Sequence, residues 1–138
     1  MISVIATRYA NALVDVVTAP DSGLDPQQVG DQLGSISVAM IESPDLRAVL
    51  MSPAVPKVKK KALIGRVADA MAIPRKVKNF LFLAVDRGRI AQLPEIREAY
   101  DLALDDKLGF IRADIASAEE LTVDQRTRLE AQLTQQAG

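Results

Sequence analysis

The sequence predicts a mainly α-helical protein: a six-helix bundle over residues 1–108, followed by an incomplete α/β tail over residues 109–138 with one strand and one helix. Apolar residues recur at helical spacing in six successive segments, and serine, aspartate, proline or glycine bounds each of them. Hydrophobic residues make up 49% of the chain but aromatic residues only 4%. Because β-sandwiches favour aromatic and β-branched residues, this composition favours close-packed helices.

The first helix is expected to run from about Ser3, a good N-cap, to Thr18. Its apolar residues follow the helical i, i+4, i+7, i+8 pattern: Ile5, Tyr9, Ala12, Leu13 and Val16. A second stripe widens the apolar surface beyond one face: Ile2, Ala6, Ala10, Leu13 and Val17. The next two helices open with a capping residue followed by proline, at Asp25–Pro26 and Ser43–Pro44.

Prolines also mark the starts of the last three helices of the bundle, near Pro56, after Pro74 and at Pro94. We expect the fifth helix to stop at Gly88 and the sixth at Gly109. The residues expected to be buried on the fourth helix are Val58, Ala62, Leu63, Val67 and Met71.

After Gly109 the hydrophobic period changes. Apolar and polar residues alternate over residues 110–115 well enough to predict one strand. Residues 122–125 resemble a capping box that opens a last helix, with Leu129 and Leu133 on one face. Because a single strand cannot satisfy its own backbone groups, the tail is expected to be a domain begun but not finished.

The composition argues against catalysis. The chain has no cysteine and no histidine, so it lacks a thiolate metal site, the commonest general base and the commonest metal ligand. No glycine-rich phosphate loop is present. We therefore predict a protein that is not an enzyme, with no cofactor and no metal. No signal peptide is visible, and no apolar stretch approaches the roughly 20 residues needed to span a bilayer, so another subunit must hold the protein at any membrane.

The 17 basic and 18 acidic residues give a formal net charge of −1, which argues against a nucleic-acid partner. The strongest local charge feature is a run of four lysines: Lys57, Lys59, Lys60 and Lys61. It could contact nucleic acid or acidic lipid, but no aromatic residues interleave with it, so a solvated helix face is favoured.

The first and fifth helices carry more apolar positions than one core-facing stripe requires. Small residues on the first helix, such as Ala12, would let another helix approach closely. Two such helices can form a groove for an amphipathic partner helix, or they can simply be central in the bundle. Periodicity alone leaves both alternatives open.

Specific motifs resemble the delta subunits of F-type ATP synthase, the family that includes the mitochondrial oligomycin-sensitivity-conferring protein. The blocks that carry the resemblance are RYANAL at 8–13, LMSPAV at 50–55, NFLFL at 79–83, RGRI at 87–90, LPEI at 93–96, and the segment from Gly109 to Thr122. Each block is weak alone, but their order and spacing cover almost the whole chain.

The resemblance implies a six-helix N-terminal domain in the stator, or peripheral stalk, of the rotary synthase. In that family the domain binds an N-terminal helix of an alpha subunit of the catalytic head, in a groove between its first and fifth helices. The matching positions here are Tyr9, Ala12, Leu13, Val16, Asn79, Phe80 and Leu83. This resemblance favours the groove over the central-helix alternative.

Family members continue past the segment that matches Leu133 into further strands, with a DxxxxGG block and a closing DGS motif, and this sequence has neither. The resemblance therefore implies a C-terminally truncated member. Its second partner, the b-subunit stalk, would be engaged through a C-terminal portion that is only partly present. With an assumed bacterial origin, the implied location is peripheral, on the cytoplasmic side of the plasma (inner) membrane.

A different class remains as the alternative: an RNA-binding helical module like bacterial transcription antitermination factors. Such proteins place arginines on an N-terminal face, whereas Arg8 is the only arginine in the first 46 residues here. A scaffold for an unrelated helix is a third possibility.

Overall fold

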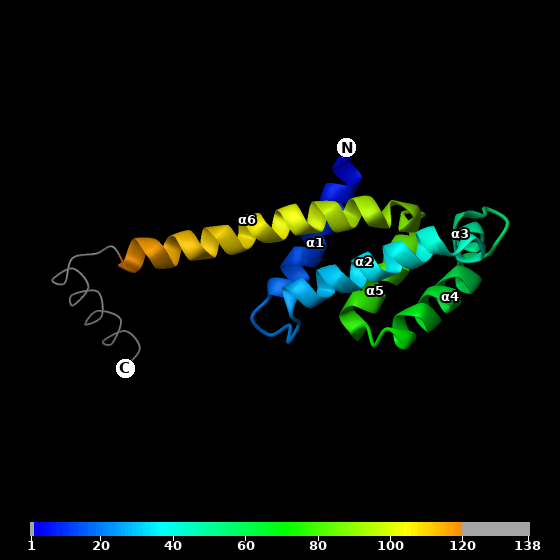
Figure 1. Cartoon of the computed structure of the whole chain (residues 1–138), viewed down its shortest axis with the longest axis horizontal. Helices are drawn as coiled ribbons and strands as arrows, with labels where there is room; N and C mark the ends of the chain where they lie inside the picture. The colour runs from blue at the N-terminus through cyan, green and yellow to red at the C-terminus, as the bar shows by residue number, and fades with distance from the viewer. Residues whose placement is uncertain (1, 120–138) are drawn as a thin grey trace. The chain divides into compact units, whose positions relative to one another are not determined.

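The computed structural model describes residues 2–119. This part of the chain is helical and contains no strand: α1 (Val4–Thr18), α2 (Pro26–Glu42), α3 (Pro44–Met51), α4 (Lys57–Ala70), α5 (Arg75–Asp86), the short 3-10 helix η1 (Ile90–Gln92) and α6 (Leu93–Glu119) (Figure 1). The predicted mainly helical class is confirmed. The helix predicted after residue 122 lies outside the described residues.

Side-chain caps fix the starts of the first three helices where the sequence predicts them. The Ser3 hydroxyl accepts a hydrogen bond from the Ala6 amide at 3.1 Å. Asp25 caps α2 and Ser43 caps α3 in the same way, and in both helices proline occupies the first turn. Each cap satisfies an amide that has no partner within its helix, which is why these residues define the boundaries.

The end of α5 is fixed by glycine. Gly88 has a φ of 68°, a left-handed conformation that glycine adopts without steric cost. The Arg89 amide donates to the Ala84 carbonyl at 2.7 Å, and the Gly88 amide donates to the Val85 carbonyl at 3.0 Å. These two bonds form a Schellman motif, so the predicted stop is confirmed.

The strand predicted for residues 110–115 is wrong. These residues, and the expected stop at Gly109, lie inside α6, which continues to Glu119. Gly109 is not among the glycines with positive φ. A glycine inside a helix costs only about 1 kcal/mol, and a helix satisfies its own backbone whereas a lone strand cannot.

The buried side of α4 also differs from the prediction. Its buried residues are Ile64 and Ala68, whereas Val58 is 75% exposed. Apolar residues are spread around this helix, so its sequence specifies no single face. The packing of α4 against α5 selects the face that is buried.

The chain divides into two compact units, residues 1–104 and 105–138. The core of the first unit consists of side chains with almost no exposed surface, the largest being Tyr100, Leu13, Leu33, Ile36, Ile64, Leu81, Leu93 and Ile96. Every helix of the unit except α3 and η1 contributes to this set; Leu50 is the buried residue of α3, and Ile90 is that of η1. Of the second unit, the structure describes residues 105–119, which belong to α6.

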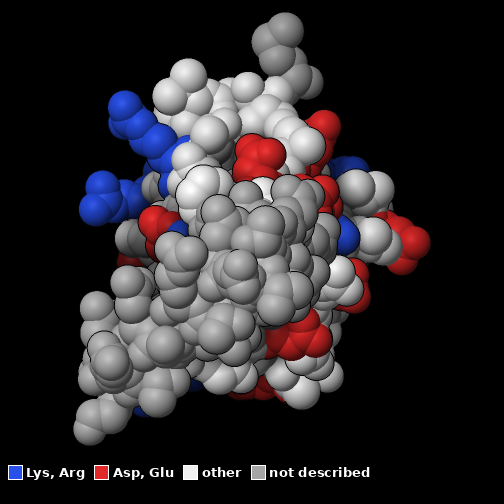
Figure 2. Space-filling view, turned by 90° about the vertical axis from the view of Figure 1, so that its left-hand side faces the viewer, with Lys and Arg blue, Asp and Glu red and all other residues white. Residues whose placement is uncertain are grey.

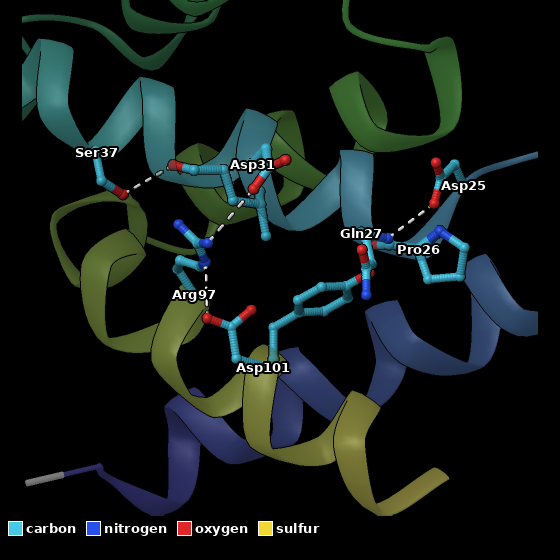
Figure 3. Close-up of polar contacts among 9 residues, drawn as sticks. Asp25, Pro26, Gln27, Asp31, Ser37, Arg97 and Asp101 are labelled. Atoms are coloured by element: carbon cyan, nitrogen blue, oxygen red, sulfur yellow. Dashed lines mark hydrogen bonds and ion pairs between the residues drawn. The ribbon is translucent and has the colours of Figure 1, made fainter. Parts of the chain in front are cut away.

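Two glycines let α6 approach α2 closely. A Cβ atom at Gly30 would lie 3.3 Å from the Tyr100 ring, and one at Gly34 would overlap the end of the Arg97 side chain. Arg97 reaches from α6 toward Asp31 of α2, at 3.8 Å, and bonds Asp101 one turn along its own helix, at 2.9 Å (Figure 3). The Tyr100 hydroxyl donates to the Pro26 carbonyl at 2.6 Å, which ties α6 to the start of α2.

This contact predicts a loss of stability at high pH. Burial, with Asp101 and Asp25 adding to it, raises the pKa of Tyr100 to about 12 from the ordinary 10.0. Between these values the folded chain keeps a proton that the unfolded chain has released, so stability is full below pH 10 and falls as pH rises toward 12. We expect a loss of about 1.4 kcal/mol per pH unit in that window.

Urea unfolding measured across that pH range would check this, with Tyr100→Phe as the control. The variant has no phenol to ionise, so its stability should decline less steeply. Parallel declines for both proteins would mean that Tyr100 is not responsible.

Within residues 2–119, no helix is long and apolar enough to cross a bilayer.

A candidate helix-docking groove

An open groove of about 230 Å³ lies between α1 and α5. Three residues of α1 and two of α5, with the residue that ends α5, line it: Arg8, Tyr9, Ala12, Phe80, Leu83 and Arg87. On both helices these residues recur at helical spacings, so each helix presents one continuous face to the groove.

Two aromatic side chains, one from α1 and one from α5, contact each other in the groove. The rings of Tyr9 and Phe80 meet edge to face, with centroids 6.1 Å apart and an interplanar angle of 73°. Such pairs contribute about 0.5–1.5 kcal/mol beyond the area they bury. Phe80 is only 9% exposed and Leu83 is 44% exposed, so the groove has a packed base and an accessible apolar wall.

The exposed apolar surface continues along α1 beyond the groove. Val4 and Val16 are 71% and 45% exposed. They lie eight residues before and four residues after Ala12, so helical spacing places them on the same side of α1. A partner longer than the groove could therefore keep apolar contact with this helix.

The structure brings together four of the seven residues predicted for the site. Tyr9 and Ala12 line one wall, and Phe80 and Leu83 line the other. Leu13 instead belongs to the core, with 1% of its surface exposed. The remaining two, Val16 and Asn79, are exposed but do not line the groove.

Sequence reasoning missed the two arginines. Arg8 comes from α1, and Arg87 is the C-cap of α5. Their spacing could have revealed them, because Arg8 lies four residues before Ala12 and Arg87 four residues after Leu83. Neither arginine is among the groove positions that the family resemblance matched, and neither belongs to the apolar stripe of its helix.

The groove offers accessible apolar area and two positive charges, which suits docking of an amphipathic helix. Among the described residues, no group of three or more acidic, histidine or cysteine side chains could hold a metal ion. Elsewhere in residues 2–119, the side-chain oxygens of Gln32 and Gln92 are buried without a hydrogen-bond partner, and neither residue lines the groove.

Comparison with known proteins agrees with the motifs. The family model described as ATP synthase delta (OSCP) subunit matches residues 5–138. The ATP synthase subunit delta of Koribacter versatilis is 33% identical over 134 residues, covering 97% of this chain and 74% of the relative. That of Anaeromyxobacter dehalogenans is 35% identical over 132 residues, covering 95% and 72%.

The subunit delta of Oleidesulfovibrio alaskensis is 33% identical over 137 residues, covering 99% of this chain and 74% of the relative. No solved structure matches the chain. The match to the family spans the groove-lining residues of both α1 and α5. The chain therefore belongs to the ATP synthase delta (OSCP) subunit family, the members of which are non-catalytic subunits of F-type ATP synthase.

Proposed function

We propose that this chain is a peripheral-stalk subunit that holds the catalytic head of the synthase by docking an N-terminal helix of an alpha subunit between α1 and α5. The observation that carries the proposal is the open apolar groove between these two helices. Family membership supplies the context, and the accessible wall at Leu83 supplies a surface for a partner.

Each groove residue has a proposed role. Tyr9 and Leu83 are the anchors, because their side chains present apolar surface to the groove. Ala12 is small, so the backbone of the partner helix can come close to α1. Phe80 forms the base through its contact with Tyr9.

The three predicted residues outside the groove have supporting roles. Leu13 holds α1 in position from within the core, where it is 1% exposed. Val16 and Asn79 are exposed near the groove-lining residues of their own helices and would contact the ends or flanks of a bound helix.

The task of a stator is to resist torque. If the rotor turns inside the head, the head must be kept from turning with it. A helix seated along a groove resists shear because many small dispersion contacts must break together, although each is worth only about 0.1–0.2 kcal/mol. The arrangement of residues in the groove suits this mechanical role.

The wider assembly follows from the same proposal. Residues 1–108 would bind the head, and residues 109–138 would begin the portion that engages the b-subunit stalk. The protein would then sit peripherally on the cytoplasmic face of a bacterial plasma membrane, held there by its partner subunits.

The RNA-binding alternative has less support. Two of the four clustered lysines contact the end of α5: Lys57 donates to the Asp86 carbonyl at 2.6 Å, and Lys61 lies 3.0 Å from the Asp86 carboxylate. On the described part of the face in view in Figure 2, Asp and Glu side chains accompany the Lys and Arg side chains. A nucleic-acid site would require a denser basic surface.

Calorimetric titration with a peptide of the alpha subunit's N-terminal helix tests the proposal. We expect saturable one-to-one binding, and no binding of a scrambled peptide with the same composition, because only the native order forms an apolar stripe. Absence of binding by a chain shown to be helical by circular dichroism would contradict the proposal.

A further inference from the structure

We infer that the groove between α1 and α5 selects a helix with acidic side chains along the edges of its apolar stripe, and that Arg8 and Arg87 recognise those carboxylates. This inference rests on the proposed docking function and adds to it the charge of the partner. Each of the two helices contributes one arginine to the groove.

Both arginines are free to bind a partner. Each is exposed, and among residues 2–119 neither forms a salt bridge or a side-chain hydrogen bond within the chain. Their own helices offer no acidic side chain that could neutralise their charge. No aspartate or glutamate lies three or four residues from either of them in the sequence, the spacing at which helical side chains meet.

Two lysines near α5 differ from this pair because each has an acidic partner within the chain. Lys61 pairs with Asp86, and Lys78 pairs with Asp69 at 2.7 Å. The charges left without a partner in this region thus include two that border an apolar surface. Guanidinium groups bind carboxylates through two parallel hydrogen bonds, so an acidic helix edge is a fitting counterpart.

The geometry favours a peptide over a nucleic acid. Bases stack on the faces of exposed aromatic rings. Here the Phe80 side chain is 9% exposed and its ring is engaged edge to face with Tyr9. The exposed side chains that line the groove between Tyr9 and the arginines include the aliphatic Ala12 and Leu83, which match an apolar stripe.

Three designed helical peptides test the inference. They share one leucine stripe and differ at the flanking positions, which are glutamate, glutamine or lysine. At about 0.05 M salt we expect the glutamate helix to bind about tenfold more tightly than the lysine helix, with the glutamine helix between them. At about 0.5 M salt the three affinities should converge, because exposed charges are screened.

The double variant Arg8→Gln/Arg87→Gln should remove this preference, so that the glutamate, glutamine and lysine helices bind it with similar affinities. The matched control, Arg47→Gln/Arg66→Gln, removes the same charge from exposed positions that do not line the groove and should retain the preference. Equal loss in both doubles would mean that net charge matters and the groove arginines do not, which overturns the inference.

The other possible results of the peptide experiment also support or overturn the inference. Failure of the glutamate helix to bind, or equal binding of all three peptides, overturns the inference; in the latter case docking itself stands. Binding of the glutamate helix without binding of the alpha-subunit peptide supports the inference and contradicts the proposed partner. A single-stranded RNA oligonucleotide that displaces the glutamate helix through Arg8 and Arg87 would assign the groove to nucleic acid instead.

Discussion

Replacing Tyr100 by alanine should lower the free energy of unfolding by about 3–5 kcal/mol. The side chain has no exposed surface, and its ring packs against Gly30, where a Cβ atom would lie 3.3 Å away. The substitution removes this packing, leaves a cavity between α2 and α6, and deprives the Pro26 carbonyl of its 2.6 Å hydrogen bond. Urea unfolding followed by circular dichroism would measure the loss.

Two further variants separate the causes. Tyr100→Phe keeps the ring and loses only the hydroxyl, so it should cost about 1 kcal/mol. Leu102→Ala removes an apolar side chain from the same helix at a position that is 57% exposed, and it should change stability by about 0.5 kcal/mol or less. If Tyr100→Phe cost as much as Tyr100→Ala, the hydrogen bond rather than the packing would join the two helices.

Replacing Ala12 by tryptophan should weaken binding of the alpha-subunit peptide about a hundredfold, the scale of a central interface residue. The indole would occupy the groove beside Tyr9 and Leu83, where the partner helix is proposed to lie. The fold should be unaffected because Ala12 is exposed. Calorimetry would give the affinity, and the emission of the introduced indole would report its environment, since the chain has no other tryptophan.

Ala62→Trp is the matched control. Ala62 is an exposed alanine on α4 that lines none of the groove, so the same bulk there should leave the affinity unchanged. Equal binding by both variants would place the docking surface elsewhere. Equal loss by both would mean that the substitution acts through something other than the groove.

The helix starts could be predicted because they depend on local chemistry. Ser3, Asp25 and Ser43 accept amide hydrogen bonds within two or three residues of themselves, so the sequence contains both partners. The stops were less predictable. Gly88 and Gly109 were both expected to end a helix, yet of the two only Gly88 adopts a left-handed conformation.

The difference between these glycines depends on tertiary contacts at Gly88 and on local helix propensity at Gly109. After Gly88 the chain turns into η1, which contacts both α5 and α3. After Gly109 the backbone continues as helix through residues 110–119, which include three alanines, the best helix former. Alternation over six residues was too short to outweigh that propensity.

The candidate site, like the helix boundaries, could be predicted only in part from the sequence. The family resemblance named Tyr9, Ala12, Phe80 and Leu83 as site residues, and all four line the groove. It could not show that Leu13, also on the apolar stripe of α1, turns into the core. That depends on which side of α1 the other helices cover, and so on contacts between residues far apart in the sequence.

The distance along the chain between the walls of the groove has a consequence for assembly during synthesis. One wall ends at Ala12, and the other is complete only at Arg87. A nascent chain on the ribosome therefore has no groove until α5 has emerged and packed beside α1. If a partner helix docks in this groove, it can do so only after α1 and α5 have packed against each other.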